Sequence, residues 1–245
     1  MIALPLPPTA GLDLGADLHV ATTLSYGRAT LAAAVARAVA TGLRELGVAD
    51  HAGPGPGWLD AYVATVRAAA AVAPLRVHCG LEIGLLDAAG ALDLPAGTRP
   101  RLSRVDYVVL VPAGPAVVQR PRARPTAEQV VEDVLLAALR AAATLPVPAV
   151  LAGLFAVLPK LGLHERDVPD QAVRELGWAC GRAGVAIEVG ERWRAPSPRV
   201  ARLLAGAGVA LAAGSAARSV AEIGRWAHVR DVAAALTAAP AGLRP

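Results

Sequence analysis

Cysteine, lysine and aromatic residues are scarce in this chain of 245 residues, and each shortage excludes a class of protein. The two cysteines, Cys79 and Cys180, are too few and too far apart for a disulfide framework or a Cys-x-x-Cys metal site, so we expect buried free thiols. Lys160 is the only lysine, the arginines are dispersed, and aromatic residues make up 3% of the chain. The formal charge of +4 therefore does not indicate a nucleic-acid-binding protein, because no basic stripe with interleaved aromatics is present. It supports only a weak preference for anionic ligands.

Targeting and membrane signals are also missing. The N-terminus has no basic region and carries three prolines within residues 5–8, so we expect no signal peptide and a cytoplasmic location. The stretch Ala141–Pro159 has no charged residue, but prolines interrupt it, and a strand buried on both faces reads in the same way. We therefore expect no membrane span. The glycine-rich phosphate loops and the Gly-x-Ser-x-Gly nucleophile turn are absent as well.

What the chain does contain is a regular alternation of short apolar strands and amphipathic helices. Seven such units in one chain of this length favour a parallel sheet in a closed or nearly closed barrel, and one domain over residues 1–245, with an extension at 1–12 and a tail or helix at 229–245. Residues 120–125 read as an excursion at the rim. We expect a short first strand in the stretch that begins at Asp17. Further strands are expected near residues 43–49, 75–82, 105–111, 149–154, 185–189 and 209–213, and helices near 29–41, 58–72, 126–143, 171–183, 198–207 and 220–226.

Polar residues follow the first three predicted strands, where α/β folds place their chemistry. The first stretch, Asp17 to Gly27, reads Asp-Leu-His-Val-Ala-Thr-Thr-Leu-Ser-Tyr-Gly; the second ends in Asp50-His51 and the third in Gly-Leu-Glu82. These stretches resemble the motifs of the PHP (polymerase and histidinol phosphatase) superfamily of metallophosphoesterases. The resemblance covers Asp17 to about residue 228 and implies a distorted TIM-like (β/α)7 barrel.

The resemblance also implies that most metal ligands have been replaced. Of the ligand positions that can be placed, His19, His51 and Glu82 keep a donor side chain. In the family, the histidines of the first and second motifs bind different metal ions. A site for a single ion would therefore require His19, His51 and Glu82 to meet at a point that their counterparts in the family do not share. The replaced ligand positions hold Ala21, Ala113, Gly153, Ala216 and Arg218, and Tyr26 stands where an acidic residue is usual.

Several further residues are candidates for a cavity or an anion site at the strand ends. Glu188 alternates with apolar neighbours, so it should face the barrel interior and need a cationic partner, for which Arg192, Arg194 and Arg218 are available. Arg218 either holds an anion or pairs internally with Glu188 or Glu82. Lys160 either faces the mouth or is solvated on its loop. The complete set of anion-binding or cavity candidates is Arg218, Glu188, Lys160, Arg192, Asp17 and Asp50.

Two hypotheses of function follow. The first is a non-catalytic PHP-type protein with an eroded multi-metal centre that binds a small anionic or phosphorylated ligand or a protein partner, without a cofactor. The second is a residual phosphatase that uses one divalent ion (zinc, manganese or iron) at His19, His51 and Glu82, since two histidines and a carboxylate are an adequate ligand set. Without the other motifs, a lone His51 after a strand is better explained as a hydrogen-bonded rim residue than as a metal ligand, and we assign no catalytic residue.

Overall fold

Seven parallel strands form one sheet in the computed structural model, which describes residues 11–114, 117–118 and 125–238. The strands are ordered β1 to β7 as in the sequence, so every connection joins neighbouring strands in the same direction. This confirms the α/β barrel class expected from the alternation. The strands are β1 (Ala16–Val20), β2 (Glu45–His51), β3 (Arg76–Leu85), β4 (Tyr107–Pro112), β5 (Ala149–Leu151), β6 (Val185–Gly190) and β7 (Leu211–Gly214).

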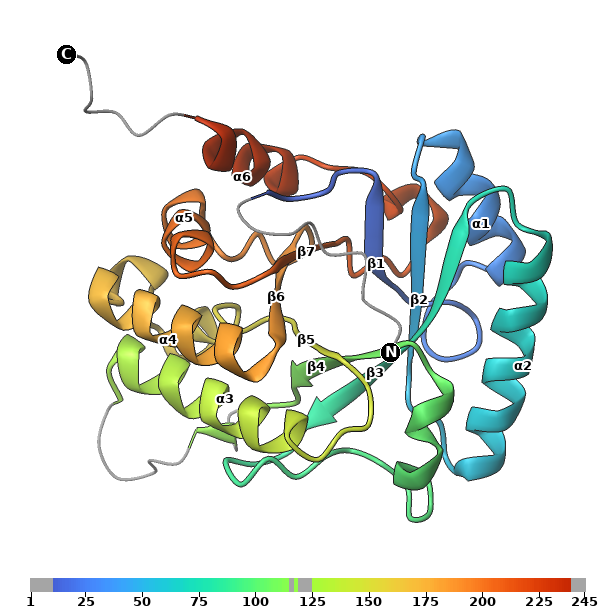
Figure 1. Ribbon diagram of the computed structural model, residues 1–245, viewed down its shortest axis with the longest axis horizontal. Helices are drawn as coiled ribbons and strands as arrows, with labels where there is room; N and C mark the ends of the chain where they lie inside the picture. The colour runs from blue at the N-terminus through green and yellow to red at the C-terminus, as the bar shows by residue number, and fades with distance from the viewer. Residues whose placement is uncertain (1–10, 115–116, 119–124, 239–245) are drawn as a thin grey trace.

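The sheet is nearly closed into a barrel, because the chain after β7 pairs with β1. Ala217 donates its N–H to the carbonyl of His19 at 3.2 Å and accepts the N–H of Ala21 at 3.0 Å. Figure 1 shows β1 beside β7 and the other strands passing around the centre. The seventh strand therefore meets the first at the carboxyl end, where the candidate residues lie.

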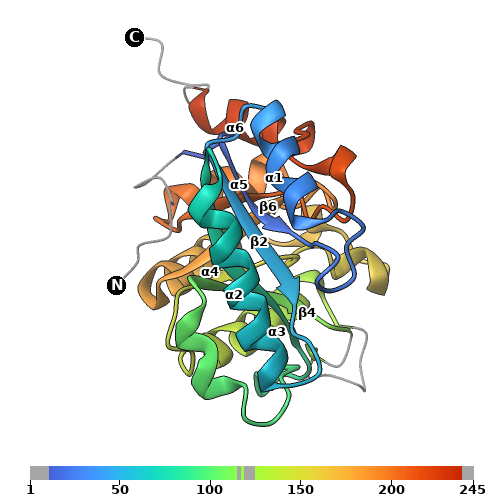
Figure 2. The ribbon, with the colours of Figure 1, turned by 90° about the vertical axis from the view of Figure 1, so that its right-hand side faces the viewer.

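Helices cover the outside of the barrel (Figures 1 and 2). One expectation needs correction: the helix expected near 220–226 is a short 3-10 turn, η5 (Val220–Glu222). A 3-10 helix, η1 (Arg99–Arg104), lies between β3 and β4. The segment predicted at the rim lies mostly outside the described residues. The helices are α1 (Leu31–Ala40), α2 (Pro56–Val72), α3 (Ala127–Ala142), α4 (Asp170–Ala183), α5 (Pro198–Gly206) and α6 (His228–Thr237).

Helix ends follow the sequence signals closely. The Thr126 side chain accepts the N–H of Gln129, and the Gln129 side chain accepts the N–H of Thr126, a capping box that starts α3. The turn after α1 contains Gly42 at φ 78°, a left-handed conformation that favours glycine. No helix within the described part of the chain is long and apolar enough to span a membrane.

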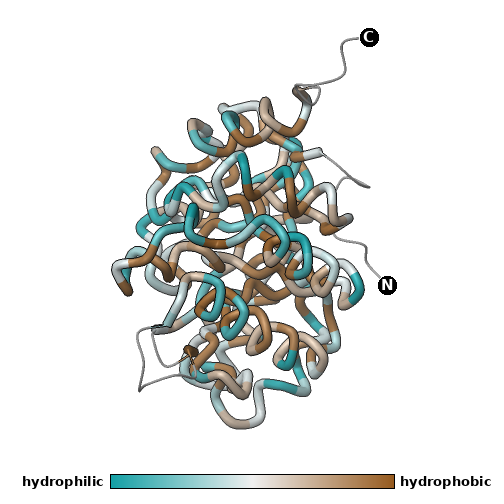
Figure 3. The backbone as a smooth tube through the Cα atoms, turned by 90° about the vertical axis from the view of Figure 1, so that its left-hand side faces the viewer, coloured by the Kyte–Doolittle hydropathy of each residue, from teal (hydrophilic) through white to brown (hydrophobic). Residues whose placement is uncertain are grey.

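Two apolar layers hold the fold together. The larger lies between the barrel and the helices, whose sequences alternate hydrophobic and hydrophilic stretches in Figure 3. The smaller fills the barrel around Tyr107, whose hydroxyl donates to the carbonyl of Leu18 at 2.6 Å. Gly47 and Gly80 leave room for that ring, since a Cβ on Gly47 would lie 2.0 Å from the Tyr107 hydroxyl oxygen. Tyr107 therefore closes the bottom of the site described next.

Candidate functional site

The candidate site is a cluster of ionisable side chains above Tyr107, at the carboxyl ends of the strands. On β2, β3 and β6 the side chains alternate between the two faces, so His51, Glu82 and Glu188 all point inward. On β1 the pairing register shifts between Asp17 and Val20, and such an irregularity can re-aim a side chain. His19 joins the inward group at this shift.

His19 lies between two carboxylates. Its Nδ1 is 2.6 Å from Oε2 of Glu188, and its Nε2 is 2.8 Å from Oε2 of Glu82. The side chains of His19 and Glu188 retain 4% and 2% of their exposure, so water cannot screen these contacts. Each ring nitrogen thus faces an acceptor, which is the arrangement of a protonated imidazole.

The electrostatics of the cluster favour that charge. Burial opposes a charge on His19, but the carboxylates of Glu188 and Glu82 outweigh it and raise the pKa of His19 well above its ordinary value. Burial would raise the pKa of Glu82, but hydrogen bonds from His19 and His51 lower the pKa of that carboxyl well below its usual range. Near neutral pH the centre of the site therefore holds a protonated His19 beside an ionised Glu82.

Tyr26 and Arg218 form the outer wall of the site. The Tyr26 hydroxyl donates to Oε2 of Glu82 at 2.5 Å, and burial beside that carboxylate raises the pKa of Tyr26. The guanidinium carbon of Arg218 lies 4.6 Å from the centroid of the Tyr26 ring, within the range of a cation–π contact. No ion pair within 4 Å links Arg218 to a described carboxylate. Arg218 is exposed, so one face of its guanidinium remains available to solvent.

His51 lies on the other side of Glu82. Its Nδ1 is 3.4 Å from Oε1 of Glu82, and its Nε2 is 3.4 Å from Oδ2 of Asp93. The contact with Glu82 raises the pKa of His51, against a smaller opposing effect of burial. Asp93 reaches this position because the hairpin after β3 folds back, with its N–H donating to the carbonyl of Gly84 at 2.8 Å.

Two buried aspartates, Asp50 and Asp17, hold the loops beside the cluster through hydrogen bonds. Asp50 accepts the N–H and hydroxyl of Thr22, both at 2.7 Å, and the hydroxyl of Ser25 at 2.6 Å, so it fixes the loop that carries Tyr26. Asp17 accepts backbone N–H groups of Ser215 and Gly224 at the β7 side. Burial raises the pKa of Asp17 to about 6, and it also raises the pKa of Asp50. Both aspartates thus hold backbone in place and have few acceptor positions left for a ligand.

The remaining candidates lie at the rim. Arg192 is 3.5 Å from Glu222, and Lys160 places its Nζ 5.6 Å from the centroid of the Trp193 ring. Neither contacts Glu188. The second carboxylate oxygen of Glu188, Oε1, is buried and has no hydrogen-bond partner among the described residues.

Glycines around Glu188 make room for its carboxylate. A Cβ on Gly214 would lie 2.5 Å from Oε2 of Glu188, and a Cβ on Gly190 would lie 2.9 Å from Oε1. Real Cβ atoms do not approach so closely, so any larger residue at Gly214 would displace the carboxylate from His19. Gly190 and Gly214 therefore have a packing role beside Glu188.

The donor atoms in this arrangement do not fit a metal ion. A ligating histidine must offer an unprotonated nitrogen, whereas both nitrogens of His19 face carboxylate oxygens at hydrogen-bond distance. Across the described ranges, no three His, Cys, Asp or Glu side chains are placed as a group that could hold a metal. His19, His51 and Glu82 do converge, since Glu82 contacts both histidines.

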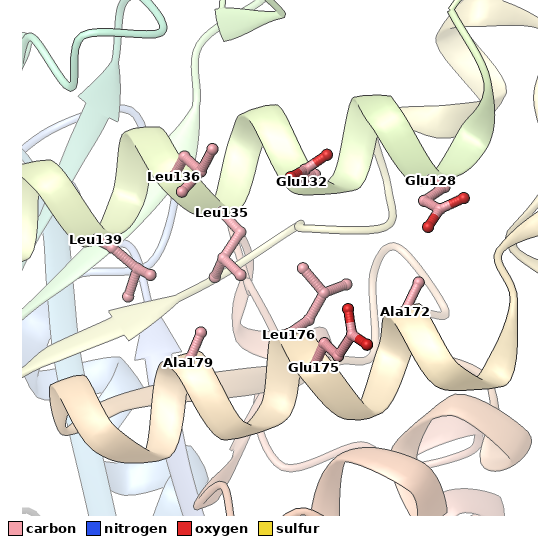
Figure 4. A pocket seen from close by; sticks show the side chains of 9 residues that line it. All are labelled: Glu128, Glu132, Leu135, Leu136, Leu139, Ala172, Glu175, Leu176 and Ala179. Carbon is pink, nitrogen blue, oxygen red and sulfur yellow. The ribbon is translucent and has the colours of Figure 1, made fainter.

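A hollow elsewhere on the molecule is lined by acidic and apolar side chains. It lies between α3 and α4, where Figure 4 shows Glu128, Glu132 and Glu175 around a floor of leucine and alanine side chains. Three carboxylates repel an anion. The positive groups at the barrel mouth therefore make it the better candidate for an anionic ligand.

Comparison with known proteins gives a fold match without a sequence match. No protein-family model matches the sequence, and no curated protein matches it. A solved structure of histidinol phosphate phosphatase from Lactococcus lactis subsp. lactis Il1403, in complex with zinc, L-histidinol and phosphate, matches with a TM-score of 0.57 and 14% identity over 90% of this chain and 92% of that chain. The fold is PHP-like.

A dihydrodipicolinate synthase from Oceanobacillus iheyensis matches with a TM-score of 0.38 and 13% identity, over 84% of this chain and 68% of that chain, which is too weak to carry an argument. The stronger match, at 14% identity, supports the architecture expected from the motifs. It does not extend to ligands or activity.

The structure corrects two expectations about individual residues. The partner of Glu188 is His19 and none of the three arginines considered, because those arginines lie at the rim while Glu188 is buried. Arg218 stacks on Tyr26 and does not pair with Glu188 or Glu82. Asp93, which was not among the candidate site residues, faces His51. It reaches this place because the hairpin after β3 folds back on the strand, and no local pattern in the sequence encodes that contact.

Proposed function

We propose that this chain is a non-hydrolytic, PHP-like protein that binds a small anionic group, such as a phosphate ester, beside Arg218. The observation that carries the proposal is the distribution of charge at the mouth. His19 lies between the buried carboxylates of Glu82 and Glu188 and contacts both, whereas Arg218 forms no ion pair with either of them. An exposed guanidinium offers a planar fork of donors that matches phosphate or carboxylate.

Thermal unfolding with and without inorganic phosphate tests the proposal. Phosphate at 100 times its Kd should stabilise the wild-type protein by about 2.7 kcal/mol, because it binds only the folded state. Arg218→Ala should abolish that stabilisation and cost less than about 1 kcal/mol of intrinsic stability, since only the contact with Tyr26 is lost. The exposed Arg182 on α4 provides the control, and Arg182→Ala should keep the phosphate effect.

A larger intrinsic loss, near 3 kcal/mol, with no phosphate effect in either form, would show that Arg218 is a structural counter-ion instead. Unchanged phosphate stabilisation in Arg218→Ala would place the anion elsewhere.

The competing proposal is a hydrolase of phosphate monoesters that uses one divalent ion. The observation in its favour is that Glu82 lies between His19 and His51, so the three residues meet at one place. Metal analysis of the purified, dialysed protein separates the two proposals. Near-stoichiometric zinc, manganese or iron, together with metal-dependent release of nitrophenol from 4-nitrophenyl phosphate, would support the hydrolase.

A further inference from the structure

Trp193 and Lys160 form a rim patch that the proposed anion site does not use. Lys160 belongs to a 3-10 helix, η3 (Leu158–Leu161), after β5, and Trp193 lies in the loop after β6. The Lys160 ammonium lies 5.6 Å from the indole centroid, and Trp193 is 43% exposed. Among the described residues Lys160 has no ion pair within 4 Å, so its charge is not neutralised by a neighbouring carboxylate. Trp193 is therefore a large exposed aromatic ring with a cation beside it.

The loop that carries Trp193 after β6 has a defined backbone geometry. Gly190 donates its N–H to the carbonyl of Ala195 at 2.8 Å, which closes the loop at its base. Arg194, next to Trp193, has a φ of 51°, a left-handed conformation that is uncommon for a residue with a side chain. A Cβ on Gly190 would lie 3.7 Å from Cδ1 of Trp193 and 2.9 Å from the unpartnered Oε1 of Glu188. The indole edge therefore sits beside the buried cluster.

Hollows lie on both sides of Trp193. One is an apolar slot over the ends of β4 and β5, lined by Gly114, Gly153 and Ala156, with Lys160 at its edge. The other is a recess that Arg194 and Arg166 help to line. Trp193 lines both hollows; Lys160 lies in the slot, and the recess carries Arg166, Arg194 and Arg199 against one acidic side chain, Glu165.

We propose that Trp193 and Lys160 form a subsite for the ring of an aromatic anion, such as an aryl phosphate or aryl phosphonate. The ring stacks on the indole, as aromatic pairs do in offset geometry, and Lys160 attracts the negative group. This inference rests on the proposed function and narrows it, because it names the class of anion that the mouth would prefer.

Calorimetric titration with two phosphonates tests the subsite. Phenylphosphonate and methylphosphonate carry the same anionic group, resist hydrolysis and differ in the ring. Wild-type protein should bind phenylphosphonate about five- to tenfold more tightly, in line with the usual strength of an aromatic pair. Trp193→Leu should reduce this ratio to about one, whereas Trp193→Tyr should keep most of it. Lys160→Met should weaken phenylphosphonate several-fold at low salt.

Trp178 provides a matched control, since it is 47% exposed on α4 and Trp178→Leu should leave the ratio unchanged. Equal affinities of the two phosphonates in the wild type, or a ratio that survives Trp193→Leu, would overturn the subsite. If methylphosphonate binds and depends on Arg218 while the ring adds nothing, the subsite fails and the proposed function stands. If neither phosphonate binds, both fail. Should Trp193→Leu not fold by circular dichroism, Trp193→Tyr and Lys160→Met decide the outcome.

Discussion

A single histidine organises the charges of this site. His19 is buried between Glu82 and Glu188, and all three come from different strands. Buried charges are costly unless they are paired, so the three side chains stabilise one another only as a set. Removing the His19 imidazolium would leave the carboxylates of Glu82 and Glu188 buried in the barrel without the cation that contacts both.

His19→Gln should therefore lower the free energy of unfolding by about 3–5 kcal/mol near neutral pH, the usual cost of breaking a buried pair. Because folding raises the pKa of His19, its contribution is complete below the unfolded value of about 6.5 and is lost as pH rises through the higher folded value. Folding lowers the pKa of Glu82, so that contribution is complete above about 4.3 and is lost as pH falls through the folded value.

Urea unfolding of the wild type and the variant from pH 3 to 9 measures this difference. It should be largest between about pH 4.3 and about pH 6.5, and it should shrink both in acid and in alkali. A difference that stays constant across the range would mean that His19 acts through packing and carries no charge.

At the scale of elements, the loop between β1 and α1 depends on a neighbouring strand. Asp50, at the end of β2, accepts three hydrogen bonds from Thr22 and Ser25 and so holds Tyr26 over Glu82. The Thr22 N–H is buried, and Asp50 is the side chain that accepts its hydrogen bond. Loss of the Asp50 carboxylate would leave this N–H without that acceptor.

Asp50→Ala should destabilise the fold by about 2–4 kcal/mol, because it leaves buried donors unsatisfied. Amide hydrogen exchange at residues 22–27 should accelerate more than exchange in the strands. Asp87 offers a comparison, since it accepts the N–H groups of Ala89 and Ala91 in an outer turn. Asp87→Ala should cost about 1 kcal/mol without loosening the loop. Equal exchange effects from both substitutions would remove the special role given to Asp50.

At the scale of the whole molecule, the width of the barrel depends on glycines that face Tyr107. A Cβ on Gly47 would lie 2.0 Å from the Tyr107 hydroxyl and 2.7 Å from the backbone of Leu18. Backbone cannot move aside cheaply, so even one methyl group at this position strains several strands at once.

Gly47→Ala should reduce the free energy of unfolding by about 2–3 kcal/mol, since overpacking of a filled core forces such shifts. Gly57 on α2 has nothing within 4 Å of its would-be Cβ, so Gly57→Ala should be neutral or stabilise by up to about 1 kcal/mol. Thermal melts of both variants measure the contrast. Equal stability of the two variants would argue against a filled barrel interior.

The sequence by itself determined the class of fold and most element positions. Strands buried on both faces and helices with one apolar face repeat in order, and local signals such as Thr126 and Gly42 set helix ends. The helix expected near 220–226 was wrong, because the structure has a 3-10 turn at Val220–Glu222. The segment carries apolar residues, but only packing decides whether a turn that short continues as a helix.

The sequence also brought His19, His51 and Glu82 to one end of the barrel, because each ends or lies within a strand of a parallel sheet. It could not decide which charges pair. The contact of His19 with Glu188 joins residues 169 positions apart. It depends on the register shift in β1 and on the space left by Gly214, neither of which a local pattern encodes. The same holds for Arg218 on Tyr26, where closure of β7 against β1 sets the geometry. Strand periodicity is local and so is readable from sequence, whereas side-chain pairing across a barrel is a property of the closed structure alone.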